Sequence, residues 1–157
     1  MSNNGNSIAY GLTMSMSAAG LAVGTAATQF AWTGTPSIVI DGLPYPTTAH
    51  TACAFSNGHT TQTADTVCLY GVWVGATGNV VTYQGEIVGA GALSAGLVAL
   101  PIPPDATAGL APLGLIRVAV TNTASSTFVP NTTSLAAANI TDTYIDCLKM
   151  PSKPYTS

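Results

Sequence analysis

Short apolar runs separated by turn residues follow one another along most of the chain. Residues 66–75 (TVCLYGVWVG) form the densest run, and a turn at 76–79 leads to a returning run at 80–83. Residues 114–121 (GLIRVAVT) alternate with the two-residue period of a strand that has one apolar face. A last apolar run covers residues 142–148 (DTYIDCL). These patterns predict antiparallel strands joined by tight turns.

The clearest turn signal is the Asp41-Gly42 pair between residues 37–40 (SIVI) and 43–45 (LPY). Asp-Gly supplies the positive φ angles of a two-residue type I′ turn, so this segment predicts a hairpin. Pro44 cannot donate a hydrogen bond to a neighbouring strand, so it shortens the second strand or places it at a sheet edge. Several short strands of this kind predict an all-β fold, either a β-sandwich or a barrel of short antiparallel strands.

Two regions are compatible with more than one structure. Residues 46–65 are rich in Thr, Ala, His and Asn, and predict either a loop or a short helix. Residues 86–100 are rich in Gly, Ala and Leu, and predict a short helix or a crossing loop. Three prolines within residues 101–104 then stop regular structure.

The N-terminal part of the chain has a period-two pattern of its own. Large apolar residues alternate with small or polar ones from residue 8 to residue 16, which predicts a strand with one buried face. Residues 17–28 are mostly Ala, Gly and Thr, which pack closely against another backbone but form a poor core. We therefore expect an extended N-terminal arm over residues 1–29, a β-rich body over 30–148 and a C-terminal tail over 149–157.

Such an arm can add a strand to a neighbouring copy or to another protein through edge pairing. The residues we expect to make inter-subunit contacts are the apolar set of the arm and the first tryptophan: Ile8, Tyr10, Leu12, Met14, Met16 and Trp32.

Charge is scarce along the whole chain of 157 residues. Only 6% of the residues are charged, against about 25% in ordinary soluble domains. The three basic residues are Arg117, Lys149 and Lys153, which form no cluster for phosphate or anionic lipid, so we expect neither nucleic acid nor membrane as a partner. With 47% hydrophobic residues and a net charge of -3, a packed fold is expected. Its surface must be covered mainly by small and weakly polar residues, which favours burial against other protein copies.

The candidate metal ligands are few and scattered. His50 and Cys53 stand three residues apart, with His59 and Cys68 downstream. A zinc site needs three or four ligands, usually with short paired spacing, so we expect no metal and no other cofactor. Cys53, Cys68 and Cys147 make an odd number, which favours buried free thiols and synthesis in a reducing cytoplasm. No Lys or Arg precedes the apolar residues 14–28, so we expect no secretory signal.

The sequence contains no recognisable arrangement of catalytic residues. Asp142 and Asp146 lie four residues apart in a predicted strand, which separates their carboxylates by about 13 Å. That separation exceeds the spacing of a glycosidase acid and base. His50 and His59 stand in no recognisable base motif, and no nucleophile elbow is present. We therefore expect a protein that is not an enzyme.

The aromatic residues allow two interpretations. Trp32, Tyr70, Trp73 and Tyr83 could form a platform on which sugars stack. The simpler interpretation places them in a sandwich core, with the second face of the sheet buried in an oligomer. Val72 and Trp73 are neighbours in one strand and therefore face opposite sides.

Five segments taken in order carry a resemblance to a known family. They are residues 40–47 (IDGLPYPT), 68–74 with the turn at 78–81, 100–101 leading to 111–118 (APLGLIRV), 128–135 (FVPNTTSL) and 140–144 (ITDTY). Together these segments resemble small structural proteins of tailed bacteriophages, found among head-decoration (cement) and other virion proteins. The resemblance spans about two-thirds of the chain and leaves out most of the first 30 residues.

The resemblance implies a non-enzymatic protein that binds the outer capsid surface and stabilises contacts between capsid subunits. The implied partners are the major capsid protein and further copies of the chain, with a trimer as the first expectation. The implied location is the capsid surface of the virion, after synthesis in the host cytoplasm. The family carries no catalytic residue or cofactor over to this sequence. The alternative is a tail-fibre or head-fibre adhesin domain that binds host surface glycans through Trp32, Trp73 or tyrosines.

Overall fold

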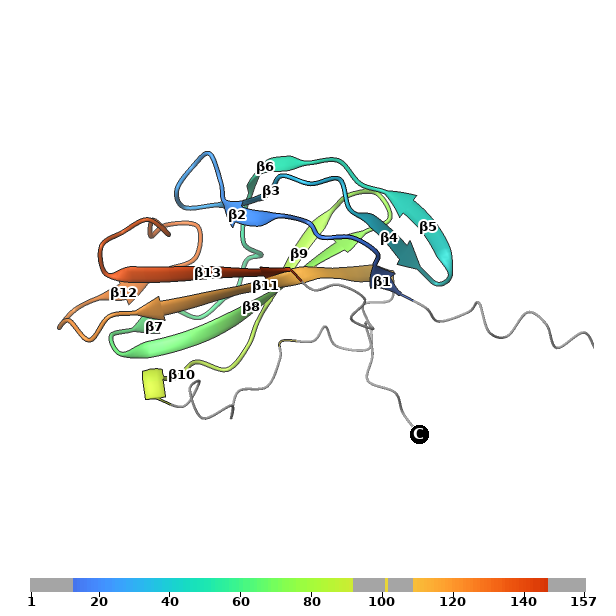
Figure 1. Cartoon of the computed structure of the whole chain (residues 1–157). Coiled ribbons are helices and arrows are strands. Elements are labelled where there is room, and N and C mark those ends of the chain that lie inside the picture. Colours follow the sequence, from blue (N-terminus) through green and yellow to red (C-terminus); the bar gives the residue numbers. More distant parts are fainter. Residues whose placement is uncertain (1–12, 92–100, 102–108, 147–157) are drawn as a thin grey trace, which may run out of the picture.

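The computed structural model describes residues 13–91, 101 and 109–146. These residues form an all-β fold of antiparallel sheets, as the sequence predicts, and none of the sheets they form is closed into a barrel (Figure 1). The sheets β2-β3-β6 and β1-β4-β5 lie over the sheet that contains β8, β11 and β13 (Figure 1). This arrangement is consistent with a β-sandwich.

The strands, in chain order, are β1 (Met14–Ser15), β2 (Leu21–Val23), β3 (Phe30–Trp32), β4 (Ser37–Ile40), β5 (Leu43–Pro46), β6 (His50–Cys53), β7 (Gln62–Thr63), β8 (Thr66–Gly75), β9 (Val80–Gln84), β10 (Val88–Gly89), β11 (Leu110–Val120), β12 (Thr127–Phe128) and β13 (Ile140–Asp146). The largest sheet has the order β10-β8-β11-β13. The strand β9 also belongs to this sheet and pairs with β8. The strands β12 and β7 form a separate two-stranded sheet.

The strands β8 and β11 are the centre of the fold, because both are buried over most of their length. Tyr70 of β8 lies opposite Ile116 of β11, and both side chains are fully buried. On this face they pack with Phe30 and Trp32 of β3 and Ile38 of β4, in one hydrophobic core between the sheets. Burial of apolar surface of this kind is the main stabilising contribution to a fold of this size.

The hairpin predicted around Asp41 and Gly42 is confirmed. Both residues have positive φ angles, 51° and 82°, and β4 pairs with β5 on either side of them. Pro44 and Pro46 lie on β5, an edge strand of the β1-β4-β5 sheet. A proline is tolerated at such an edge because its missing N–H group does not interrupt hydrogen bonds between paired strands.

The N-terminal boundary of the body differs from the prediction. β1 pairs with β4, β2 pairs with β3, and Ala19 and Leu21 are part of the core. The N–H of Gly34 donates to the carbonyl of Ala19 at 2.8 Å. The small residues of this segment therefore serve close packing within the body, and the expected arm over residues 1–29 is wrong for residues 13–29. Residues 1–12 and the predicted tail 149–157 lie outside the described residues.

The two ambiguous regions are partly defined. Residues 46–65 contain the strands β6 and β7, which excludes a helix there. Residues 86–91 contain β10, and Ala90 and Gly91 begin a helical turn at the limit of the described segment. The last strand begins at Ile140, two residues before the predicted start.

Candidate interaction surface

A histidine and two hydroxyl groups meet beside β9, and they are the nearest approach to a catalytic arrangement in the described residues. His59 Nε2 lies 2.8 Å from Thr82 Oγ1, which also accepts a hydrogen bond of 2.8 Å from the N–H of Ser56. The N–H of Thr82 in turn donates to Ser56 Oγ at 2.9 Å. Burial lowers the pKa of His59 and so favours the neutral ring. Because only 2% of Thr82 is exposed, its hydroxyl cannot reach a substrate, and the group instead fixes the 56–59 loop to the sheet.

A second polar group lies inside the core around Tyr70. The side-chain amides of Gln62 and Gln84 donate to the Tyr70 hydroxyl at 2.9 Å and 3.2 Å. Burial raises the pKa of Tyr70, so the phenol stays neutral. Phe55 and Phe128 contact the Tyr70 ring edge-on, with ring centroids 5.1 Å and 6.2 Å away. The enclosure by aromatic rings indicates a structural role for this hydrogen-bonded network.

The residues considered as metal ligands do not come together. His50 packs against the Trp32 ring, with centroids 4.4 Å apart, whereas His59 contacts Thr82. Cys53 and Cys68 are buried free thiols, and burial raises the pKa of each to about 11. Within the described residues no group of three or more His, Cys, Asp or Glu side chains could hold a metal ion. The third cysteine, at position 147, lies outside the described residues.

The two aspartates of β13 have separate structural partners. Asp146 accepts hydrogen bonds from the backbone N–H groups of Gly20 and Leu21, at 3.2 Å and 3.3 Å. Asp142 lies near Tyr144, and burial together with this carboxylate raises the pKa of the Tyr144 phenol. Asp146 therefore ties the end of β13 to the segment between β1 and β2.

Neither tryptophan is available as a platform for sugars. Trp32 is fully buried and its indole N–H donates to the carbonyl of Thr48 at 2.8 Å. Only 3% of Trp73 is exposed. The expectation that Trp32 makes an inter-subunit contact is therefore wrong, because this side chain fills the core beneath β3 and β6.

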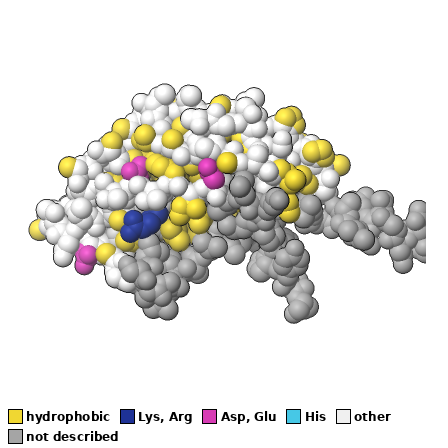
Figure 2. Space-filling view, viewed as in Figure 1, with side chains coloured by type: hydrophobic (Ala, Val, Ile, Leu, Met, Phe, Trp, Pro, Cys, Tyr) yellow, Lys and Arg dark blue, Asp and Glu magenta, His cyan; other side chains and the backbone are white. Residues whose placement is uncertain are grey.

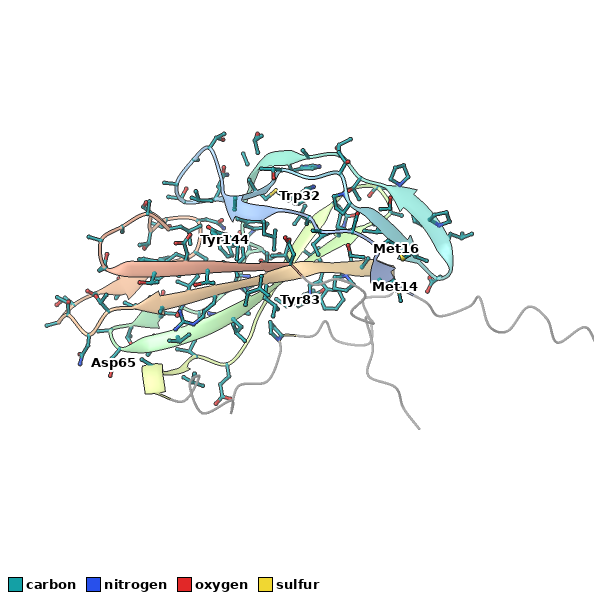
Figure 3. All side chains as sticks on the ribbon, viewed as in Figure 1. Met14, Met16, Trp32, Asp65, Tyr83 and Tyr144 are labelled. Carbon is teal, nitrogen blue, oxygen red and sulfur yellow. The ribbon has the colours of Figure 1, made fainter. Side chains whose placement is uncertain are left out.

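The outward side of the β1-β4-β5 sheet is mainly apolar, with Ser37 of β4 as an exposed polar residue opposite Pro46. Met14 lies opposite Val39, and Val39 lies opposite Pro44, so these three side chains share one face. Met16 and Pro46 continue this face by the two-residue alternation, and Met16 is 48% exposed. Figure 3 shows Met14 and Met16 together at β1, at the end of the molecule that carries β4 and β5. We call these five residues, Met14, Met16, Val39, Pro44 and Pro46, the outer face.

The outer face is apolar because the hydroxyl-bearing residues of β1 point inward. Thr13 and Ser15 are buried. Thr13 Oγ1 accepts a hydrogen bond from the N–H of Asp41 at 3.1 Å, and Ser15 Oγ donates to the carbonyl of Ser17 at 2.9 Å. Since these hydroxyls have partners, the strand can bury its polar side and turn its methionines away from the core. The buried apolar face predicted for this strand is therefore wrong at Met16, which is 48% exposed, whereas Met14 is half-buried. The other apolar residues of the pattern, Ile8, Tyr10 and Leu12, lie outside the described residues.

Charge is absent from the outer face and rare around it. Asp41, in the turn, is the one charged residue of the first 64 positions of the sequence. Leu43, next to that turn, is 60% exposed. Figure 2 shows hydrophobic side chains gathered at this end of the molecule, with no coloured charge among them in this view. A surface of this kind suits contact with another apolar protein surface.

A second, smaller surface lies on the opposite side of the large sheet. There Arg117 of β11 lies between Leu69 of β8 and Thr143 of β13, and Ile145 nearby is 43% exposed. Arg117 is the one Lys or Arg in the described part of the chain. A single guanidinium does not make a phosphate-binding surface.

Compared with known proteins, the chain matches no family model, no curated protein and no solved structure at a significant level. Among the described residues, no helix has the length and hydropathy needed to cross a bilayer. The outer face is therefore the feature on which a functional proposal rests.

Proposed function

We propose that this chain is a non-enzymatic virion structural protein that binds the outer surface of a tailed-bacteriophage capsid and stabilises contacts between capsid subunits. The observation that carries the proposal is the uncharged outer face of the β1-β4-β5 sheet, on which Met16, Pro44 and Pro46 are exposed. The order of the sequence segments that resemble decoration proteins supports the same assignment. The proposed partners are the major capsid protein and further copies of the chain, after synthesis in the host cytoplasm.

The physical argument is one of repetition. A capsid presents the same binding position many times, so a weak apolar contact is multiplied when each bound copy bridges neighbouring subunits. A rigid domain loses little conformational entropy on docking, which favours binding through a modest surface. A chain with 6% charged residues also brings few charges that would have to be desolvated in such a contact.

The adhesin alternative is less favoured for a specific reason. Recognition of a sugar ring by stacking requires an exposed aromatic face. Trp32 and Trp73 are both buried, so that alternative is left with its tyrosines, of which Tyr45 and Tyr83 are half-buried. A glycan array probed with the folded chain remains a direct comparison, and strong specific binding would favour the adhesin.

The experiment that tests the proposal uses particles of the phage that encodes this chain, with and without its gene. We expect quantitative mass spectrometry to find the chain in copy numbers comparable with the capsid protein, far above those of a tail component. Particles that lack it should release their DNA at a lower temperature, and adding the purified chain back should restore the release temperature. A copy number of only a few per particle, or no effect of adding the chain back, would contradict the assignment.

A further inference from the structure

We propose that Asn57, in the turn between β6 and β7, is a site of spontaneous deamidation, at which the folded chain converts this asparagine into aspartate or isoaspartate without an enzyme. The inference concerns a covalent change within the chain and does not depend on the capsid assignment. The co-reactant is water, and the product that leaves is ammonia.

The reaction uses groups of the turn itself. The backbone nitrogen of Gly58 attacks the side-chain carbonyl carbon of Asn57, so a bond forms between these two atoms and the C–N bond of the side-chain amide breaks. The amide nitrogen leaves as ammonia, with the proton that the Gly58 nitrogen has lost. Water then opens the five-membered imide. Opening at the side-chain carbonyl gives aspartate, whereas opening at the backbone carbonyl gives isoaspartate, in which the backbone runs through Cβ.

The first argument is the residue that follows each asparagine. Among the asparagines that the structure describes, Asn57 is the one followed by glycine. The others precede β-branched residues, which are Val80, Thr123, Thr132 and Ile140. A β-branched side chain crowds the backbone nitrogen of its own residue and is stiff, whereas glycine has no side chain to hinder the attack. The reaction is therefore favoured at Asn57 over the other described asparagines.

The second argument is that the turn leaves both reacting groups accessible. Asn57 and Gly58 are exposed. Gly58 has a φ angle of 86°, and an added Cβ atom would meet nothing within 4 Å, so no neighbouring element packs over Gly58. Within the described residues, neither the Asn57 side chain nor the Gly58 N–H has a hydrogen-bond partner. Formation of the imide therefore breaks no hydrogen bond of the fold.

The third argument is that other asparagines are held in place. Asn131 Oδ1 accepts a hydrogen bond from the N–H of Phe55 at 2.7 Å, and Asn131 Nδ2 donates to the carbonyl of Phe55 at 2.8 Å. Asn79 Oδ1 accepts from Thr77 Oγ1 at 3.0 Å. Each of these side chains would have to give up its hydrogen bonds before its carbonyl carbon could turn toward the next backbone nitrogen. Asn79 and Asn131 are therefore internal references for Asn57.

The conversion affects the fold because the turn is anchored on both sides. The N–H of Ser56 and Nε2 of His59 both contact Thr82 Oγ1, at 2.8 Å each. Isoaspartate adds one backbone atom between Ser56 and His59, so the two contacts cannot both persist without strain. Either product also adds a carboxylate to the first 64 positions, where Asp41 is the one charged residue. We therefore expect the converted chain to be less stable.

The experiment incubates the purified full chain for several weeks in neutral and in mildly alkaline buffer. Peptide mapping by mass spectrometry assigns the conversion to a residue, which is necessary because the sequence has a second Asn-Gly pair at Asn4-Gly5. We expect Asn57 to convert about tenfold or more faster than Asn79 and Asn131. The rate should rise with pH, because the Gly58 nitrogen attacks after losing its proton.

The matched control is Gly58→Asn. Asparagine tolerates a positive φ angle, and a Cβ atom at this position has open space, so the variant keeps the turn while its side chain hinders the attacking nitrogen. We expect conversion of Asn57 to slow about tenfold or more in this variant. The urea midpoint of the unchanged chain should fall as Asn57 is converted, and that of the variant should change less over the same time.

Conversion of Asn57 that is no faster than that of Asn79 or Asn131, or that Gly58→Asn leaves unchanged, would overturn the inference. Circular dichroism checks the fold of the variant. If Gly58→Asn does not fold, Asn57→Gln decides in its place, because its longer side chain would have to close a six-membered ring, and conversion there at an unchanged rate would overturn the inference equally. These measurements involve no capsid, so their failure leaves the proposed function intact.

Discussion

At the scale of single residues, Gly114 shows how little space the centre of the fold leaves. It follows the irregularity in the pairing of β11 with β8, between Pro112 and Gly114. A Cβ atom there would collide with the carbonyl oxygen of Ile145 and with Leu21 Cδ1. The backbone contact cannot be relieved by a change of rotamer, so a side chain at this position has to displace β13.

We therefore predict that Gly114→Ala lowers the free energy of unfolding by about 1–3 kcal/mol. Urea denaturation followed by tryptophan fluorescence measures the change. The control is Gly89→Ala on β10, where an added Cβ meets nothing within 4 Å, and its effect should stay within about 0.5 kcal/mol. Equal stability of the two variants would show that β13 moves aside easily.

His59 predicts a dependence of stability on pH. Burial lowers its pKa in the folded protein below the ordinary value of 6.5. Between the two pKa values the unfolded chain binds more protons than the folded one, so the free energy of unfolding falls as the pH drops through this range.

The urea midpoint should thus be lower at about pH 5.5 than at about pH 7.5. His59→Gln, which keeps a polar side chain without a titrating ring, should reduce the difference between the two midpoints. A difference that is equally large in the variant would assign the effect to other groups.

At the scale of elements, the contact between the end of β13 and the segment before β2 explains why the N-terminal residues join the body. The Asp146 carboxylate accepts the backbone N–H groups of Gly20 and Leu21. Gly20 directly precedes β2 and Leu21 is its first residue, and β2 is an edge strand of the β2-β3-β6 sheet. The Asp146 carboxylate therefore links two elements that are far apart in the sequence.

Asp146→Asn should destabilise the protein by about 1 kcal/mol, because it removes the charge and one of the two acceptor oxygens. It should also speed proteolysis within residues 13–24 before the rest of the body is cut. Asp41→Asn is the matched control, since Asn tolerates the positive φ of Asp41 and the same charge is lost. If both variants are cut at the same rate, the hydrogen bonds of Asp146 do not protect residues 13–24.

The elements that the sequence predicted best are those defined by local chemistry. The strand at residues 66–75 has the predicted limits, and the Asp41-Gly42 hairpin has the predicted turn. Both follow from a continuous apolar run or from a turn that needs positive φ. By contrast, β11 begins at Leu110, four residues before its predicted start, because pairing with β8 continues through a proline and an irregular register.

The errors arose where the choice depended on distant partners. Alternation identifies two faces of a strand, but it does not tell which face the body covers. At β1 the inward face is that of Thr13 and Ser15, because Asp41 and Ser17 supply hydrogen-bond partners for their hydroxyls. Trp32 was expected either in the sandwich core or at a contact surface, and its burial depends on Thr48, sixteen residues away, accepting the indole N–H. Partners of this kind are not visible in a sequence window.

At the scale of the whole molecule, the scarcity of charge determines how copies should respond to salt. Surface ion pairs weaken as added salt screens them, whereas apolar contacts do not. Among the described residues, the outer face contributes no charged group to a contact with a second copy. Association through this face is therefore governed by removal of apolar surface from water.

If copies of the chain associate through the outer face, their assembly should persist when NaCl is raised from about 0.1 M to about 1 M. Sedimentation velocity of the full chain at both concentrations measures the distribution of species. Dissociation at the higher salt concentration would mean that ionic contacts hold the copies together.

The two prolines of β5 have a consequence for the amounts in which such a chain can accumulate. An edge strand with all its backbone donors can recruit one copy after another, which is how ordered fibres grow. A sheet margin that lacks N–H donors is a poorer template for such addition than one that has them. Pro44 and Pro46 therefore disfavour open-ended strand addition at β5 in a chain that has few charges to keep its copies apart.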